Sequence, residues 1–340
     1  MFSEEDLALT NALQVRPRAT WAELAVVLGC TEATAARRWQ RLSQTGSAWV
    51  TVVPGPTSSA CIAFVGLRCA SGQRQQVAAS LAQDPAAVTV ELVVGGQDLL
   101  VEVITPDLAA LSRYLLERVD RLPGVSRMTV SLATRVVTEA SRWRLDALEP
   151  SQSTALRSLP RAESEGARAR GLSPLDQRLL LALGEDGRQS WHQLAQSAGT
   201  SAATARRRVE RLLATGEATL RCDIASPLFR RPVTAMLWAD VPALSRDEVA
   251  RQLTPLAPVR FIATIASTHN LLITVWLRTV DEIHQLEAEL ALRHPQLVFT
   301  DRTVVLHTVK RMGRLLSAEG CATTVVPLGP WATGAQATGA

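Results

Sequence analysis

Residues 18–48 read RATWAELAVVLGCTEATAARRWQRLSQTGSA, and residues 188–218 read RQSWHQLAQSAGTSAATARRRVERLLATGEA. Extended to residues 3–48 and 173–218, the two stretches align without a gap at an offset of 170. About twenty of the 46 aligned positions are identical. Self-similarity at a fixed spacing indicates an internal repeat. The chain is therefore a tandem duplication.

Capping signals divide the start of each repeat into three short helices. Ser3 and Thr20 each precede an acidic residue three positions later, which is the pattern of a capping box. Gly29 ends the second helix, and Thr31 opens a third helix that runs to Gly46, since glycine favours the left-handed end of a helix. Residues 173–216 repeat this arrangement. Two helices joined by a tight glycine turn predict a helix-turn-helix in each copy.

The third helix of each copy has one apolar face and one polar face. A helix lying in the major groove of double-stranded DNA can present several arginine forks to phosphates or guanine edges. The candidate DNA-binding residues are therefore Thr34, Arg37, Arg38, Arg41, Thr204, Arg207, Arg208 and Arg211. For Arg38 and Arg208 a second interpretation is open. Either guanidinium could tie its helix to a carboxylate of its own unit, such as Asp6 or Glu23.

The segments that follow each third helix alternate or are rich in β-branched residues. Residues 48–53 and 218–223 are predicted strands, and they favour the winged form of the helix-turn-helix. Trp21 and Trp191 are expected to pack in the core or at its rim rather than to stack on bases.

Strands alternate with helices in the second part of each repeat. The predicted order is βαββαβ in both copies, which is typical of a ferredoxin-like sandwich. The predicted elements are residues 60–68, 73–82, 87–94, 99–105, 108–122 and 125–137 in the first copy and 233–241, 246–253, 259–267, 271–277, 280–293 and 297–309 in the second. The fold class is thus α+β, with two winged helix-turn-helix domains alternating with two ferredoxin-like βαββαβ sandwich domains.

The predicted domain boundaries follow from these patterns. They are a winged helix-turn-helix at 1–55, a ferredoxin-like effector and dimerisation domain at 56–140, a linker at 141–172, a second winged helix-turn-helix at 173–226, a second ferredoxin-like domain at 227–316 and a disordered tail at 317–340.

Composition limits the functional classes. The 340 residues are 47% hydrophobic, the net charge is only +4, and Lys310 is the single lysine, so arginine carries the positive charge. Five cysteines without CxxC spacing fit a reducing compartment. The acidic start MFSEEDLAL and the lack of a long apolar run predict a cytoplasmic protein without a membrane span.

The order of these domains resembles the Lrp/AsnC family of feast/famine transcriptional regulators. The residues that carry the resemblance are the cores LA…G…TAARRWQRL…G and LA…G…TARRRVERL…G, the hairpin GGQDLLVEV, the LPGV before the last strand of the first copy, and TVVLHTVKR near the end. The resemblance implies binding of double-stranded DNA, pairing of the sandwich domains through their sheets, and further homo-oligomers. In one chain the two copies could pair as an intramolecular pseudo-dimer, and the Pro-, Ser- and charge-rich linker suits that arrangement.

The resemblance also implies a small effector, commonly an amino acid, bound near the hairpin. The candidate effector-binding residues are Gly96, Asp98, Thr129 and Ser131. Glycine lets the backbone approach a ligand, and a carboxylate can pair with an α-amino group, although a plain turn explains the glycines equally well. The second copy reads Ser267-Thr268-His269-Asn270 at this place, so the same chemistry is not expected there.

Two other functions compete with a transcriptional regulator. Siroheme decarboxylases share this architecture and would need histidine near the first sandwich strand. The chain has five histidines, at 192, 269, 284, 294 and 307, and none lies there. A protein-interaction module that has lost DNA binding is the other alternative. No catalytic residues, metal ligands or cofactor motif emerge, so the sequence predicts a protein that is not an enzyme and has no cofactor.

Overall fold

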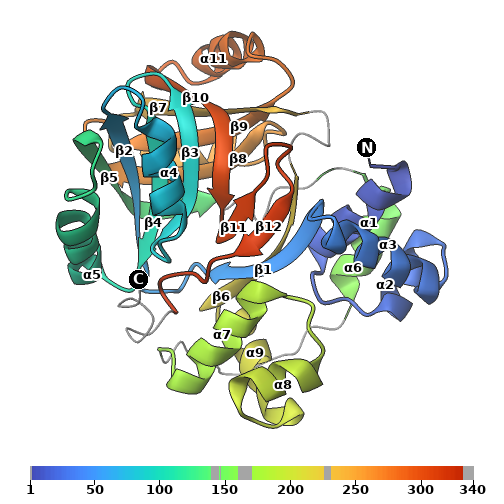
Figure 1. Cartoon of the computed structure of the whole chain (residues 1–340). Helices are drawn as coiled ribbons and strands as arrows, with labels where there is room; N and C mark the ends of the chain where they lie inside the picture. The colour runs from blue at the N-terminus through green and yellow to red at the C-terminus, as the bar shows by residue number, and fades with distance from the viewer. Residues whose placement is uncertain (1, 139–144, 146, 160–170, 226–230, 332–340) are drawn as a thin grey trace.

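Two helix-turn-helix units lie beside one closed β-barrel in this computed structural model, which describes residues 2–138, 145, 147–159, 171–225 and 231–331 (Figure 1). The helices of the two units are α1 (Glu4–Val15), α2 (Trp21–Leu28) and α3 (Glu32–Gln44), and α7 (Pro174–Glu185), α8 (Trp191–Ala198) and α9 (Ala202–Ala214). The predicted helix-turn-helix is thus present in both copies.

Local capping explains where these helices begin and end. The Ser3 hydroxyl accepts a hydrogen bond from the backbone N–H of Asp6, and the Asp6 carboxylate accepts one from the N–H of Ser3. Ser173 and Asp176 form the same box in the second unit. Gly29 and Gly199 close α2 and α8 at φ values of 65° and 68°, a left-handed conformation that other residues adopt at a cost.

The strand after each unit pairs with its counterpart in the other copy. β1 (Ala48–Pro54) and β6 (Ala218–Ile224) form a two-stranded antiparallel ribbon. The predicted strands are confirmed, but the prediction of a wing within each unit is wrong. Burial gives the reason, because each end of the ribbon completes a core with residues of both strands. Val50 and Cys222 pack on the first unit, and Val52 and Ala218 pack on the second.

Two arginines hold the units together symmetrically. Arg18 donates to the backbone oxygens of Gly187 and Gln189, and its guanidinium carbon lies 3.9 Å from the centre of the Trp191 ring. Arg188 donates to the oxygens of Pro17 and Ala19 and lies 4.1 Å from the centre of the Trp21 ring. The tryptophans therefore pack at the junction of the two units. We call these four side chains, Arg18, Trp21, Arg188 and Trp191, the arginine clamp.

The barrel uses four strands from each copy. These strands are β2 (Cys61–Cys69), β3 (Ala87–Val94), β4 (Leu99–Thr105) and β5 (Val125–Thr138) from the first copy, and β7 (Val233–Asp240), β8 (Val259–Ala266), β9 (Leu271–Leu277) and β10 (Val298–Arg311) from the second. The hydrogen-bonded order is β10-β3-β4-β2-β5-β8-β9-β7, and β7 pairs with β10 to close the ring. All of these pairs are antiparallel.

The last strand of each copy joins the two halves. β5 pairs with β2 up to Leu132 and then with β8, and β10 pairs with β7 up to Val304 and then with β3. Leu132 and Val304 are separated by 172 residues, which is the offset of the second repeat. The sequence predicted two sandwich domains that could pair through their sheets, and in the structure their sheet edges merge into one barrel because each last strand is long enough to serve both halves.

Helices cover the outside of the barrel. They are α4 (Arg74–Ala82), α5 (Leu108–Arg113) with the π-helical segment η1 (Tyr114–Val119), α10 (Arg246–Leu253) and α11 (Glu282–Arg293). Each half packs its helices on its own strands through an apolar core, and a third cluster that contains Phe64 and Met236 joins strands of both halves. The fold is therefore α+β, as predicted. No helix in the described ranges is long and apolar enough to cross a bilayer.

Two segments, predicted as a linker and as a disordered tail, contain ordered elements. The segment predicted as linker, 141–172, contains α6 (Pro150–Ser158), whose Leu156 is fully buried against the first unit. The segment predicted as a disordered tail, 317–340, contains β12 (Ala322–Val325), which pairs with β11 (Arg314–Leu316), and Trp331 is buried beside the second unit. Leu156 and Trp331 are large apolar side chains in segments otherwise rich in small and polar residues, and their burial holds these segments against the two units. The rest of both predicted segments (141–144, 146, 160–170 and 332–340) lies outside the described residues.

Candidate functional site

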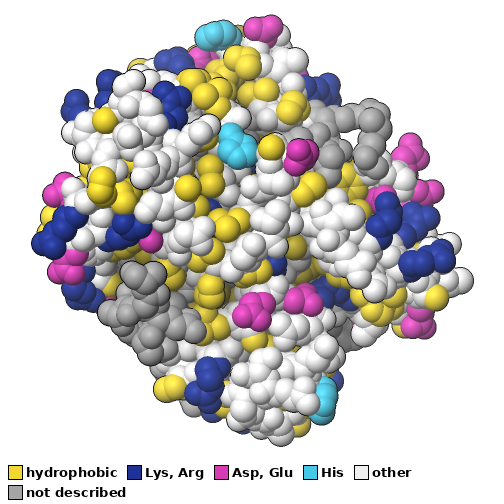
Figure 2. All heavy atoms as spheres, viewed as in Figure 1, with side chains coloured by type: hydrophobic (Ala, Val, Ile, Leu, Met, Phe, Trp, Pro, Cys, Tyr) yellow, Lys and Arg dark blue, Asp and Glu magenta, His cyan; other side chains and the backbone are white. Residues whose placement is uncertain are grey.

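The arginines of α3 are only partly engaged with the first unit. Arg41 bonds the Asp6 carboxylate at 2.6 Å, and its side chain remains 57% exposed. Arg38 lies 3.3 Å from Glu5. Arg37 is exposed and makes no hydrogen bond or ion pair with any described residue. These arginines line a shallow hollow with Ser3 and Asp6. In Figure 2, Lys and Arg side chains gather over the first unit at the right of the molecule.

The arginines of α9 are more fully paired. Arg208 and Arg211 both bond Asp176, at 3.1 and 3.2 Å, and Arg211 also bonds Glu217 at 2.7 Å. The Arg211 side chain is 24% exposed. Arg207 is exposed and has no partner among the described residues. The tether to an acidic residue of the same unit, which the sequence left open for Arg208, is thus present.

Four of the eight predicted DNA-facing side chains therefore bond carboxylates of their own unit, and these are Arg38, Arg41, Arg208 and Arg211. Arg37 and Arg207 have no such partner among the described residues. The tether of the first helix differs in detail from the one considered, because Arg41 takes Asp6 and Arg38 takes Glu5. Thr34 and Thr204 lie at the start of the helices, where their hydroxyls meet those of Thr31 and Ser201 at 2.9 and 3.0 Å.

A chamber opens between the barrel and the ribbon. Its walls come from both barrel halves and from both ribbon strands, since Val53 and Pro54 of β1 and Arg221 of β6 line it. Its volume is about 120 Å³. An engineered apolar cavity of about 150 Å³ holds one benzene molecule, so the chamber is of the size of a small organic molecule. We call it the central chamber.

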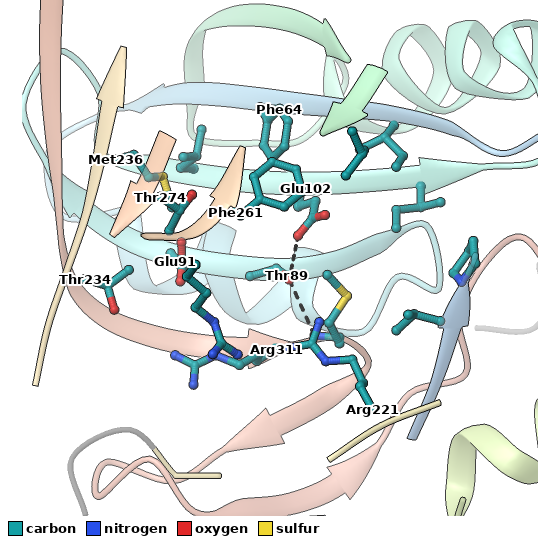
Figure 3. A pocket seen from close by; sticks show the side chains of 18 of the residues that line it. Phe64, Thr89, Glu91, Glu102, Arg221, Thr234, Met236, Phe261, Thr274 and Arg311 are labelled. Atoms are coloured by element: carbon teal, nitrogen blue, oxygen red, sulfur yellow. Dashed lines mark hydrogen bonds between the residues drawn. The ribbon is translucent and has the colours of Figure 1, made fainter. Parts of the chain in front are cut away.

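The apolar side chains and the arginines line different parts of the central chamber, and Glu102 lies beside Phe64 and Phe261 (Figure 3). Phe64 and Phe261 meet edge to face, with ring centres 5.7 Å apart, and Met236 lies near them. Arg221 and Arg311 lie on the opposite side. Three arginines line the chamber in all, and these are Arg221, Arg260 and Arg311.

A buried ion network positions these arginines. The Arg221 and Arg260 guanidiniums donate to one oxygen of Asp223, at 2.6 and 3.0 Å, and the Arg260 guanidinium stacks 3.4 Å from the centre of the Trp276 ring. Burial opposes ionisation of Asp223, but Arg221 and Arg260 outweigh it and lower the pKa of that carboxyl. Arg221 is 5% exposed, and its Nε finds no hydrogen-bond partner among the described residues.

Two glutamates also line the chamber, and one of them, Glu102, is the cross-strand neighbour of Phe64. Burial raises the pKa of Glu91, whose carboxylate accepts a hydrogen bond from Thr308 and lies near Arg311. Burial also raises the pKa of Glu102 to about 7, and its only hydrogen bond in the described chain comes from Thr89. Glu102 is therefore about half protonated near neutral pH, so that the arginines outnumber the ionised carboxylates around the chamber.

The predicted effector residues lie at a different place. None of Gly96, Asp98, Thr129 and Ser131 lines the central chamber. Gly96 and Asp98 belong to the β3–β4 hairpin, and Thr129 donates to the backbone oxygen of Gly66, next to that hairpin. Ser131 bonds Ser267 of the second copy at 2.8 Å.

The Asp98 carboxylate is occupied by contacts within the fold. One oxygen accepts the N–H of Cys69, and the other lies 3.0 Å from Arg74. Asn270 occupies the corresponding position in the second copy and accepts the N–H of Val241 in the same way. The change from aspartate to asparagine therefore preserves a backbone contact, which identifies a structural role for both side chains.

Matches to sequence families follow the same division of the chain. The AsnC-type helix-turn-helix domain matches residues 4–43 and 172–213, and the Lrp/AsnC ligand binding domain matches residues 62–143. The chain thus carries the helix-turn-helix and ligand-binding domains of the Lrp/AsnC family. It is a tandem form, with two helix-turn-helix units in one polypeptide.

Individual relatives cover about one copy. An uncharacterized HTH-type transcriptional regulator of Pyrococcus horikoshii is 25% identical over 143 residues, which are 41% of this chain and 88% of that protein. One of Pyrococcus furiosus is 27% identical over 42% of this chain and 96% of that protein.

Solved structures include one that matches the whole tandem arrangement. The siroheme decarboxylase NirDL is 14% identical, covers 92% of this chain and 95% of its own, and has a TM-score of 0.60. The same enzyme in co-complex with an iron-uroporphyrin III analogue has the same TM-score at 13% identity, over 96% of this chain and 95% of its own. At this identity the likeness shows a shared fold. No histidine is among the described residues that line the central chamber.

Sequence reasoning missed the central chamber. A signal was present, because single charged residues interrupt apolar strands in TVELVV, LLVEVI and PVRFIA. A charge at such a position is costly unless it is paired, so an interruption of this kind indicates a buried polar site.

Proposed function

We propose that the chain is a DNA-binding transcriptional regulator whose affinity for double-stranded DNA is modulated by a small molecule. Its two helix-turn-helix units act as an intramolecular pseudo-dimer, built on two ferredoxin-like halves. The exposed residues of α3 and α9, with Arg37 and Arg207 as the free arginines, contact phosphates and base edges.

One observation carries this proposal. The arginine clamp and the shared β1–β6 ribbon fix both units to one another while α3 and α9 keep exposed arginines. A fixed pair of helices related by an approximate twofold axis is the arrangement that reads two half-sites of a DNA operator. The operator is therefore expected to be an imperfect palindrome.

The small molecule has two candidate places. The hairpin set Gly96, Asp98, Thr129 and Ser131 remains a proposal for an amino acid, but the contacts of Asp98 with Cys69 and Arg74 weaken it. The central chamber is the better supported site, because it is hollow and reaches the ribbon that carries both units.

One observation disfavours an enzyme that acts on a tetrapyrrole. The described chamber wall offers arginine and glutamate but no histidine. The free arginines of both third helices disfavour a module that has lost DNA binding.

The test is DNA selection from a random pool followed by binding measurements at several salt concentrations. Replacing Arg37 and Arg41 by alanine is expected to weaken binding by about tenfold or more and to lower the salt dependence by about one unit of slope per lost phosphate contact. Replacing Arg207 and Arg211 is expected to act in the same direction.

The matched control is Arg113→Ala, which removes an exposed arginine on α5 and should leave DNA binding unchanged. Recovery of no enriched sequence, or DNA binding by both double variants at parental strength, would overturn the proposal.

A further inference from the structure

The central chamber has an uneven charge distribution that follows the duplication. All three of its arginines come from the second copy, and both of its glutamates come from the first. At the offset of 172, Arg260 corresponds to Val88, and Glu102 corresponds to Thr274. Two identical subunits could not build such a wall. The charged side is therefore a feature of this tandem chain.

The arginine side has unused capacity for an anion. Asp223 engages Arg221 and Arg260 through one oxygen, so Arg221 keeps N–H groups that Asp223 does not use. The Arg221 Nε lacks a partner in the described chain, although the residue is only 5% exposed and lines the chamber. A buried N–H without an acceptor is costly, and a ligand carboxylate supplies an acceptor that carries charge.

The opposite side fits a flat apolar body. Phe64, Phe261 and Met236 offer ring faces, edges and a thioether, and they lie across the chamber from Arg221 and Arg311 (Figure 3). Aromatic groups in such a setting gain from both burial and edge-to-face geometry. The chamber can thus hold a ring at one side while a charged group reaches the other.

We propose that the central chamber binds a small organic monocarboxylate with an aromatic or compact apolar body, and that this anion is the effector. Only the role of this anion as an effector rests on the proposed function, because binding of the anion to the chamber does not depend on DNA. A monoanion is favoured over a zwitterion because Asp223 and Glu91 already face arginines, and Glu102, which is bonded by Thr89, is about half protonated near neutral pH. Glu91 faces Arg311, and Asp223 faces Arg221 and Arg260.

The ligand would touch the part of the fold that joins the DNA-facing units. Arg221 lies on β6 opposite Thr51 of β1, and Val53 and Pro54 of β1 line the same chamber. An anion that engages Arg221 thereby contacts the ribbon shared by both helix-turn-helix cores. Such a ligand can shift the relative placement of the two units only through a difference in its affinity for the two placements.

The test is isothermal calorimetry on the full chain without DNA, with four probes of similar size. The probes are benzoate, benzamide, benzylamine and L-valine, which present an anion, a neutral isostere, a cation and a zwitterion. Benzoate is expected to bind about tenfold or more tightly than benzamide, since a carboxylate bonded to arginine is much stronger than a neutral amide. Equal binding of benzoate and benzamide, preference for benzylamine or L-valine, or no binding by any probe would each overturn the proposal.

Variants locate the site. Ile104→Trp introduces into the wall the residue that the second copy has at Trp276 and is expected to abolish benzoate binding by filling the chamber. Arg221→Gln is expected to weaken benzoate by about tenfold and benzamide little. Asp98→Asn is the control for the hairpin and should leave benzoate unchanged. Loss of benzoate binding in Asp98→Asn with normal binding in Ile104→Trp would assign the ligand to the hairpin and overturn the proposal.

The pH dependence of benzoate affinity in the unsubstituted protein gives a readout that does not require any variant to fold. The charged groups around the chamber are Glu91, Glu102, Asp223, Arg221, Arg260 and Arg311. Ionised Glu102 repels an anion, so benzoate is expected to bind more tightly at pH 6 than at pH 8, and Glu102→Gln should remove that difference. Tighter binding at pH 8 would contradict the proposed charge arrangement. DNA binding measured on the same preparations without ligand separates failure of this site from failure of the regulator proposal.

Discussion

The two helix-turn-helix units are more similar to each other in sequence than the two barrel halves are. The units share about 20 of 46 positions, whereas residues 61–138 and 233–310 share about 12 of 78. Both parts began as copies, so the retained positions mark what the two copies must still do alike. The units keep their caps, clamp residues and helix arginines. The barrel halves keep their strand order but have exchanged the residues that line the central chamber.

This difference indicates which part of the molecule is constrained by symmetry. Two matching units are needed if they read related half-sites, and the arginine clamp works only when each copy supplies both an arginine and a tryptophan. A ligand chamber on the pseudo-twofold axis has no such requirement. Divergence there placed all of the chamber's arginines in the second copy and both of its glutamates in the first.

The largest expected effect concerns the arginine clamp. Arg18→Ala removes a stacked guanidinium and leaves the oxygens of Gly187 and Gln189 without donors, so we expect unfolding to become easier by about 2–4 kcal/mol. Arg188→Ala should cost a similar amount, because its contacts mirror those of Arg18. Chemical denaturation measures both, with the exposed Arg113→Ala as the control. A large loss in one variant and none in the other would show that the pair is not symmetric.

Local signals were sufficient to predict the helix-turn-helix units from the sequence. The capping boxes at Ser3 and Ser173 and the glycines at 29 and 199 act within a few residues, and the observed helices begin and end there. Strand positions were also close. The predicted run 87–94 matches β3, and 99–105 matches β4. Alternation and apolar content carry that information along a single strand.

Pairing between distant strands could not be predicted in this way. The sequence of residues 48–54 is equally compatible with a wing strand inside its own unit and with a strand that pairs with residues 218–224, because the same side chains would be buried in either arrangement. The two halves of the barrel join where β5 pairs with β8 and β10 pairs with β3. Both pairings require the full 14-residue length of the last strand of each copy, β5 in the first and β10 in the second. The chamber depends on that closure, so its residues became neighbours only in the fold. The effector site proposed from the hairpin has not been tested and remains a prediction.

A second expected effect concerns the glutamate wall of the first copy. Burial raises the pKa of Glu102 to about 7, whereas an unfolded glutamate titrates near its ordinary value of 4.5. The folded state therefore binds more protons between these two values, and the free energy of unfolding should fall as pH rises from about 4.5 to about 7 and then level off. The contribution is expected to be about 1–2 kcal/mol, since Glu102 is only partly buried.

Denaturation at pH 5 and pH 8 measures this contribution. Glu102→Gln should be less sensitive to pH than the parent by about that amount, and the exposed Glu117→Gln should behave like the parent. The corresponding residue of the second copy, Thr274, predicts that Glu102→Thr also flattens the profile. A parent whose stability rises over this range faster than that of Glu102→Gln would contradict the assignment.

The smallest expected effect concerns a difference between the two units just after the third helix. Glu217 neutralises Arg211, whereas the corresponding Ser47 leaves Arg41 with a single carboxylate partner, and the arginine side chains are 24% and 57% exposed. Glu217→Ser should leave Arg211 with Asp176 as its only carboxylate partner and strengthen DNA binding by about threefold, and Ser47→Glu should weaken it by about the same factor, which is the size of effect that one partly exposed ion pair contributes. The two changes together exchange the residues of the units. If reading is symmetric, the double variant should bind a palindromic operator like the parent, whereas on an asymmetric operator its preferred orientation should weaken or reverse. Binding that does not respond to either single change would mean that Arg41 and Arg211 lie away from the DNA.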